Sequence, residues 1–406
     1  MERKNVRYKT QIPFSVPSLG REELRAVAQV LESRWITTGP RTKAFEQKFA
    51  RYLGAENAVA VNSCTAGLHL ALVAYGIGAG DEVITTPYTF AATGEVILHA
   101  GAVPVFTDIE PAGFNIDPEK IEQAITPRTK AIIPVHFAGE PCRMDKIVEI
   151  ALRHNLIIIE DAAHALGARY RDKMIGSFTH ASAFSFYATK NLTTGEGGMV
   201  TTNDSEIADR IRMLSLHGLS HDAWNRYSAL GKWYYEITEL GFKYNMSDIQ
   251  AALGLVQLER FDEMQKKRKE LAQLYYQLLI ENDHIILPPR PVDSVHAWHL
   301  FVIRLKGISK TLNRNFIIRD LNKQGIGTSV HFIPLHIHPF YQNNFGYEMG
   351  DFPMAETTFE SVISLPLYPD MTETDVLEVV NALQSSIYKN EKTDLKHKVG
   401  YAEEIY

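Results

Sequence analysis

The segment LIIIEDAAH (residues 156–164) decides the fold, together with AFSFYATKN (183–191) and GEGGMVTT (195–202), which follow it. Each segment combines a short run of apolar, β-favouring residues with polar or glycine-rich residues, as is typical of buried strands and their ends. In open α/β sheets, ligands bind at the carboxyl ends of the strands. Asp161 and Lys190 each follow one of the predicted strands. We therefore expect their side chains to face one crevice.

An amine and a carboxylate in one crevice match the chemistry that pyridoxal phosphate requires. Lys190 would form a Schiff base with the aldehyde and then carry a proton between the substrate carbon and the cofactor. Asp161 would keep the pyridine nitrogen protonated, so that the ring accepts electrons. The alternatives from the residues alone are a surface charge for Lys190 and a helix N-cap for Asp161.

Three segments carry a family resemblance: EDAAHALGA (160–168), FSFYATKNLTTGEGGMV (184–200) and FKYNMSDIQAALG (242–254). They resemble the DegT/DnrJ/EryC1/StrS sugar aminotransferases, which are fold-type-I pyridoxal-phosphate enzymes, and the resemblance runs from about Phe14 to about Leu383. It implies an α/β fold with a mostly parallel central sheet flanked by helices and a smaller C-terminal α+β domain. Strand–helix alternation over residues 58–202 supports the same sheet.

The resemblance also implies contacts for individual residues. It places Thr65, Ala66 and Ser185 at the cofactor phosphate, Phe90 on the face of the ring, His164 near the phenolic oxygen, and His331 toward the sugar substrate. It places Asn245 at the phosphate of the neighbouring subunit, which implies a homodimer with shared active sites. Without the resemblance, these residues are ordinary N-cap, core, strand and loop residues.

The segment NSCTAG (62–67) supports the phosphate assignment independently, because it lies between a predicted strand and a predicted helix. The N-terminus of a helix presents free backbone N–H groups and the positive end of the helix dipole to an anion. A plain serine or threonine N-cap explains the same pattern. The histidines at positions 331, 336 and 338 lack acidic or cysteine ligands at a matching spacing, so we expect no metal site there.

Composition limits the class of protein. The chain has 406 residues, 45% of them hydrophobic, and a formal net charge of −6, which gives no support to nucleic-acid binding. The cluster 266–269 (KKRK) fits a solvated helix face. Two cysteines, no signal peptide and no apolar stretch of membrane-spanning length predict a cytoplasmic protein with no membrane association.

For the domains, we expect a large cofactor-binding domain over residues 1–255, a small domain over 256–388 and a charged tail over 389–406. Periodicity predicts one long helix over 248–273 and a last helix over 373–385. The loop around Arg226, Tyr227 and Lys232 is a candidate for contacts with a nucleotide.

The function that the resemblance implies is transfer of an amino group from an amino acid, most often L-glutamate, to a nucleotide-linked 4-keto-6-deoxyhexose or 4-keto pentose, with pyridoxamine phosphate as intermediate. A keto-cyclitol aminotransferase and a non-catalytic regulatory protein of the same fold stay open as alternatives. Dehydratases of the family carry histidine at the position of Lys190, so the lysine argues against that branch.

Overall fold

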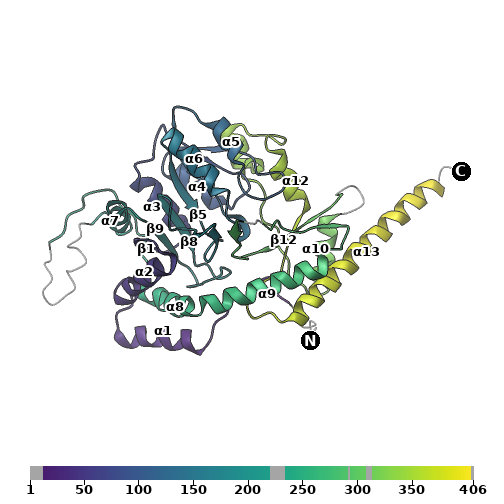
Figure 1. Cartoon of the computed structure of the whole chain (residues 1–406), viewed down its shortest axis with the longest axis horizontal. Helices are drawn as coiled ribbons and strands as arrows, with labels where there is room; N and C mark the ends of the chain where they lie inside the picture. Colours follow the sequence, from purple (N-terminus) through teal and green to yellow (C-terminus); the bar gives the residue numbers. More distant parts are fainter. Residues whose placement is uncertain (1–11, 220–233, 291–292, 308–312, 404–406) are drawn as a thin grey trace, which may run out of the picture.

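The structure, a computed structural model, describes residues 12–219, 234–290, 293–307 and 313–403, with backbone alone for 391–403. Arg226, Tyr227 and Lys232 lie outside the described residues. A large α/β unit surrounds one sheet, and a smaller unit with its own sheet lies beside it (Figure 1). None of the described helices is both long enough and apolar enough to cross a membrane.

The central sheet has seven strands in the order β1-β9-β8-β5-β4-β2-β3. Their bounds are β1 (Asn57–Val61), β2 (Glu82–Thr85), β3 (Val103–Phe106), β4 (Thr129–Ile133), β5 (Ile157–Asp161), β8 (Ala181–Ser185) and β9 (Gly198–Thr202). Within this sheet, β9 runs antiparallel to both of its neighbours, β1 and β8, and the five successive strands β8-β5-β4-β2-β3 pair in parallel. The predicted mostly parallel sheet is therefore confirmed.

Helices cover both faces of this sheet. In β1, Ala58 and Ala60 pack into one core with helices α2 and α6, whereas Val59 and Val61 pack into the opposite core with α3, α4 and α7. This alternation follows from the two-residue period of a strand. The helices of the large unit are α1 (Arg21–Ser33), α2 (Pro40–Leu53), α3 (Cys64–Ala74), α4 (Ala91–His99), α5 (Pro118–Ala124), η1 (Phe137–Gly139), α6 (Met144–His154), α7 (Ser205–Leu214) and α8 (Asp248–Glu259).

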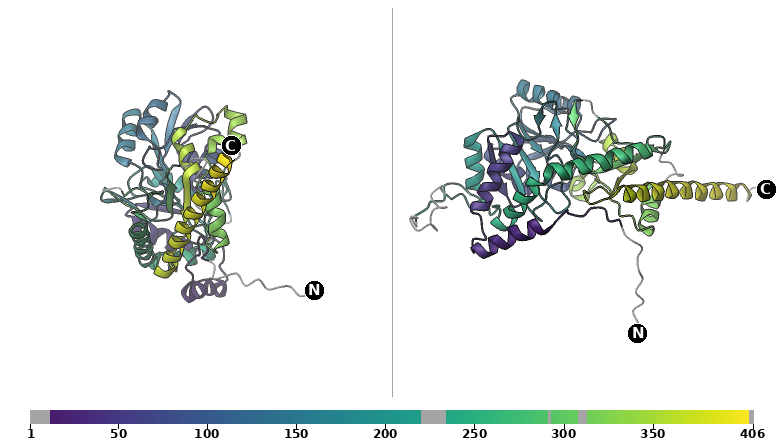
Figure 2. Two further views of the ribbon diagram at one scale, coloured as in Figure 1. Left: turned by 90° about the vertical axis from the view of Figure 1, so that its right-hand side faces the viewer. Right: turned by 60° about the horizontal axis from the view of Figure 1, so that its bottom comes forward.

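The smaller unit packs helices against the antiparallel sheet β10-β12-β13. Its elements are α9 (Phe261–Leu279), β10 (Ile285–Ile286), β12 (Phe301–Leu305), α10 (Arg314–Lys323), β13 (Val362–Leu365) and α13 (Glu373–Glu403). Helix α9 runs from the large unit to this sheet, and α13 projects beyond the body of the molecule (Figures 1 and 2). The remaining elements are β6 (Arg169–Tyr170), β7 (Lys173–Met174), β11 (Ser294–Val295), η3 (Leu335–Ile337), α11 (Pro339–Phe345) and α12 (Pro353–Ser361).

Three expectations about helices need correction. The long helix expected over 248–273 is two helices, because the chain departs from helical geometry at Arg260, where ψ is −2°. The last helix continues past residue 385 to Glu403, since lysine and glutamate favour a helix even without apolar periodicity. Arg268 of the predicted solvated face is buried, with 2% of its surface exposed. The domain boundaries stay predictions.

Candidate active site

One cavity of about 460 Å³ lies at the carboxyl edge of the central sheet, and it brings together seven of the nine predicted site residues. These are Thr65, Phe90, Asp161, His164, Ser185, Lys190 and His331. Ala66 and Asn245 do not line it. Residues separated by more than 260 positions in the chain converge here, because the strand ends and the loop before α11 meet at this edge.

Helix α3 begins beside the cavity, directly after β1. The Ser63 side chain caps this helix and accepts a hydrogen bond of 3.1 Å from the backbone N–H of Ala66. The N–H groups of Cys64 and Thr65 occupy the first two helical positions, where no acceptor within the helix exists. Gly198 lets β9 approach this turn, since a Cβ there would lie 2.5 Å from the Ser63 carbonyl carbon. The helix cap and an anion site are thus compatible, although the Ala66 amide is already engaged.

Asp161 ends β5 and is 6% exposed. Its carboxylate accepts hydrogen bonds from the Thr93 hydroxyl at 2.7 Å and from the Ala163 backbone N–H at 3.1 Å. These two donors stabilise the ionised carboxylate away from bulk water. A turn follows Asp161 rather than a helix, so the alternative helix-cap role is not what the structure shows.

Lys190 lies in the turn after β8, with its backbone N–H bonded to the carbonyl of Tyr187. Burial lowers the pKa of Lys190 to about 8, and the nearby thiol of Cys64 and the carboxylate of Asp161 oppose that shift. No residue of the described chain is hydrogen-bonded to Nζ. The amine is therefore partly neutral near pH 8 and open to the cavity, as a nucleophile requires.

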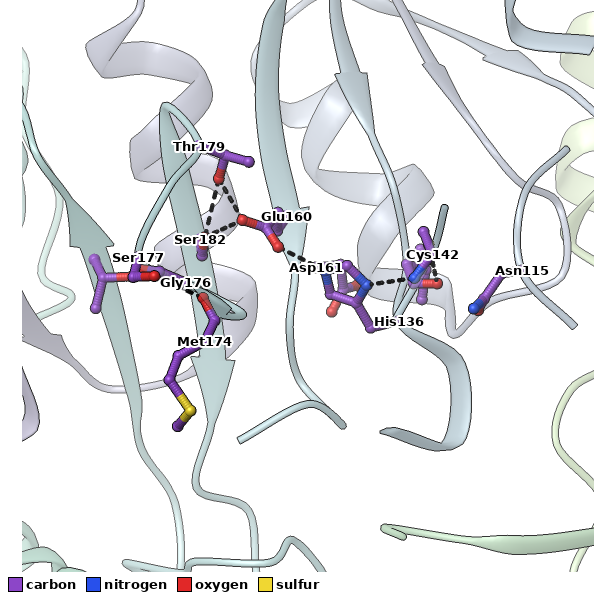
Figure 3. A network of polar contacts seen from close by, with 12 residues as sticks. Asn115, His136, Cys142, Glu160, Asp161, Met174, Gly176, Ser177, Thr179 and Ser182 are labelled. Carbon is purple, nitrogen blue, oxygen red and sulfur yellow. Dashed lines mark hydrogen bonds and ion pairs between the residues drawn. The ribbon is translucent and has the colours of Figure 1, made fainter. Parts of the chain in front are cut away.

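Glu160, the neighbour of Asp161 in β5, anchors a buried polar network (Figure 3). Its carboxylate accepts hydrogen bonds from the hydroxyls of Thr179 and Ser182, the latter at 2.9 Å, and lies 2.7 Å from Nε2 of His136. The backbone N–H of Cys142 donates to Nδ1 of His136, so the proton of this imidazole is on Nε2 and points at Glu160. The network fixes the strand end that carries Asp161.

Three histidines line the cavity, and one of them, His299, was not among the predicted residues. The ring centroids of His164 and His299 are 4.3 Å apart. Burial and the Lys190 charge hold the pKa of both well below its usual range, and burial lowers the pKa of His331 to about 4. His299 precedes β12 in the smaller unit, so only the packing of the two units could reveal it.

The other histidines of the His331 loop do not join the site. His336 is buried and lies 2.8 Å from Glu356, whereas His338 lines a neighbouring cavity of about 630 Å³. Across the described residues, no three histidine, cysteine or acidic side chains form a metal-binding group. Phe90 is 62% exposed between the two cavities, with its ring centroid 6.0 Å from that of Phe332. It is therefore not a core residue.

Asn245 lies away from the cavity of its own chain. Its amide donates to the Thr38 hydroxyl at 2.7 Å and accepts from Lys243 at 2.6 Å. It lines a different cavity, next to the exposed side chain of Trp35. The role that the resemblance implies for Asn245 requires a second subunit.

Comparison with known proteins gives this geometry a context. A sequence model of the DegT/DnrJ/EryC1/StrS aminotransferase family matches residues 17–384. The chain belongs to this family. It is 53% identical to the spore coat polysaccharide biosynthesis protein SpsC of Bacillus subtilis over 377 residues, which cover 93% of this chain and 97% of SpsC. Fold and family predictions are thereby confirmed.

Solved structures of family members show the same fold. The putative sugar aminotransferase Spr1654 of Streptococcus pneumoniae, in its pyridoxamine-phosphate form, has a TM-score of 0.88 and 36% identity, with 93% of this chain and 100% of that one covered. Helicobacter pylori PseC, an aminotransferase involved in pseudoaminic acid biosynthesis, has a TM-score of 0.87 and 31% identity, with 94% and 100% covered. The protein is therefore a pyridoxal-phosphate-dependent aminotransferase.

The cavity residues fit the cofactor. Lys190 supplies an amine with no hydrogen-bond partner among the described residues, Asp161 supplies a stabilised carboxylate, and the start of α3 supplies N–H groups together with the hydroxyl of Thr65. When bound, pyridoxal phosphate supplies an aldehyde that bonds amines and a ring that withdraws electrons.

Proposed function

We propose that this aminotransferase transfers an amino group from an amino acid, L-glutamate by expectation, to the keto carbon of a nucleotide-linked keto sugar for cell-envelope polysaccharide or amino-sugar biosynthesis in the cytoplasm. The observation that carries the proposal is that Lys190 and Asp161 line the same cavity. The descriptions of SpsC and PseC support a carbohydrate substrate. The adjoining cavity of about 630 Å³, which shares Phe90 and Phe332 as walls, offers room for the rest of a large substrate.

Each residue has a role in this scheme. The N-terminus of α3 and Thr65 bind the phosphate, together with Ser185, and Asp161 accepts a hydrogen bond from the protonated ring nitrogen. Lys190 Nζ would carry the proton between the amino-bearing carbon of the substrate and the cofactor carbon that holds the nitrogen, in one direction for the donor and in the other for the keto sugar, and its pKa, lowered to about 8 by burial, suits a group that both takes and gives a proton. His164 would donate a hydrogen bond from Nε2 to the phenolic oxygen of the cofactor, because its Nδ1 already accepts one from the backbone N–H of Ala138 at 3.2 Å.

We further propose a homodimer in which Asn245 completes the phosphate site of its partner. Support comes from the position of Asn245 outside its own cavity and from the exposed apolar side chains of Trp35 and Ile36, which are 41% and 52% accessible. Neither Lys190→Ala nor Asn245→Asp homodimers should be active, but a mixed dimer holds one intact site and should recover part of the activity. A mixture without recovery would place Asn245 in its own subunit's chemistry.

The first experiment is the absorbance spectrum of the purified protein with and without pyridoxal phosphate. We expect a band of lysine-bonded cofactor that L-glutamate bleaches, and we expect Lys190→Ala to lack the band while the exposed-lysine control Lys173→Ala keeps it. A screen of nucleotide-linked keto sugars and keto-cyclitols then identifies the acceptor. Absence of the band in the loaded wild type would contradict catalysis and favour the non-catalytic alternative.

A further inference from the structure

The hydrogen bonds of the three cavity histidines determine which of them donate and which accept. His164 is fixed as a donor at Nε2, because the Ala138 amide occupies its Nδ1. His331 is not fixed, because its Nδ1 lies 2.8 Å from the Ser364 hydroxyl, which can donate or accept. His299 therefore decides whether the cavity holds a neutral acceptor.

Asn191 fixes the tautomer of His299. The amide nitrogen of Asn191 donates to the carbonyl of Ala297 at 2.7 Å and to Oε1 of Gln265 at 3.0 Å. Its amide oxygen, 3.1 Å from Nδ1 of His299, must then be the acceptor. The proton of His299 is thus on Nδ1, and Nε2 carries a lone pair.

Nε2 of His299 is available to a ligand. Nε2 has no hydrogen-bond partner within the described chain. It is also not one of the fully buried, unpartnered polar atoms of the described residues, so it retains some exposed surface, and that surface faces the cavity that His299 lines. The backbone of His299 is held on both sides. Its backbone N–H donates to the carbonyl of Ala138 at 2.9 Å, and the buried guanidinium of Arg268 lies 3.5 Å from its carbonyl oxygen.

We propose that Nε2 of His299 accepts a hydrogen bond from the ammonium group of the amino donor, and from the same group of the aminated product, beside Lys190. The inference rests on the proposed function, in which every turnover brings one amine into the cavity and releases another. An ammonium that leaves water needs an acceptor. A neutral imidazole provides one, and a hydrogen bond from a charged donor is stronger than one between neutral groups.

His299→Phe tests the proposal, because phenylalanine keeps an aromatic ring against His164 but lacks the acceptor. The probes are L-glutamate and glutarate, which is the same dicarboxylate without the ammonium. In the cofactor-loaded protein, we expect the glutamate concentration that gives half-saturation to rise by about 10- to 100-fold. This is the effect of one lost hydrogen bond to a charged group. The inhibition constant of glutarate as a competitor of glutamate should change by less than about twofold.

The outcomes separate the inference from the function on which it rests. If the wild type shows no lysine-bonded cofactor band, the proposed function fails. If the band forms and both probes weaken equally in His299→Phe, or neither does, the function stands and His299 is not the ammonium acceptor.

Asn191→Asp gives a second test that does not depend on removing the imidazole. A carboxylate at Nδ1 stabilises the protonated ring and so raises the pKa of His299. A protonated His299 cannot accept and repels the ammonium, so we expect the acid limb of the pH dependence of glutamate binding to move upward by about one pH unit. An unmoved acid limb would overturn the proposal, because a structural role of His299 predicts no such shift.

Discussion

The Thr93 hydroxyl donates a hydrogen bond of 2.7 Å to Oδ2 of Asp161 and thereby joins helix α4 to the end of β5. Both side chains are buried, and the Thr89 hydroxyl lies 2.8 Å from that of Thr93. The orientation of the carboxylate that faces the cavity thus depends on an uncharged hydroxyl of a neighbouring helix.

Replacing Thr93 by valine should weaken cofactor binding, because Asp161 loses one of its two donors while the shape of the side chain is kept. We expect the unfolding free energy to fall by about 1–3 kcal/mol and the dissociation constant for pyridoxal phosphate to rise about tenfold. Urea unfolding and absorbance titration measure the two. Thr85→Val, which removes the buried bond from Thr85 to the carbonyl of Ile133, should cost stability without changing cofactor affinity.

Replacing Lys190 by methionine should stabilise the cofactor-free protein at pH 7. The pKa of Lys190 is lowered from 10.5 to about 8 in the folded state, so the unfolded chain binds more protons between those two values. The stability of the wild type therefore rises with pH across that window. Below pH 8 the wild type bears the full free-energy cost of burying the protonated Lys190 amine. The difference in melting temperature between mutant and wild type should shrink from pH 7 to pH 10.5; a constant difference would contradict the shift.

The His136–Glu160 pair should respond unequally to substitution of its two members. His136→Leu leaves the carboxylate of Glu160, which has no exposed side-chain surface, with only the hydroxyls of Thr179 and Ser182. We expect a loss of about 3–5 kcal/mol of unfolding free energy. Glu160→Gln removes the charge instead and should cost less. Denaturant unfolding of both variants gives the comparison, and equal costs would contradict the expectation that loss of the imidazole partner is the more costly change.

Two glycines next to the cavity should tolerate alanine differently. Gly198→Ala places a methyl group 2.5 Å from the backbone of Ser63, so we expect more than about 2 kcal/mol of destabilisation and a damaged phosphate site. Gly195→Ala meets no atom within 4 Å and is strained only by its φ of 80°, which costs about 1 kcal/mol. Thermal unfolding and cofactor titration distinguish the two, and similar losses would contradict the close approach of β9.

Local patterns predicted the central sheet and its two most informative side chains, because Asp161 and Lys190 follow apolar runs that end at one sheet edge. Phe90, His164 and His331 needed the family resemblance. His299 and its partner Asn191 lie 108 positions apart, and no local periodicity connects them. Arg268 was expected on a solvated face, since its neighbours are charged, and only the packing of α9 shows that it is buried.

Buried Arg268 links helix α9 to the segment that carries His299. Further along the same helix, Leu271 and Tyr275 belong to the core of the smaller unit, while the Arg268 guanidinium donates to the Leu367 carbonyl at 2.9 Å and lies 3.5 Å from those of Trp298 and His299. Through Arg268, helix α9 therefore holds the backbone just before β12 in place. His299 is thus one point at which the smaller unit is fastened to the large one, since its backbone N–H also donates to the carbonyl of Ala138.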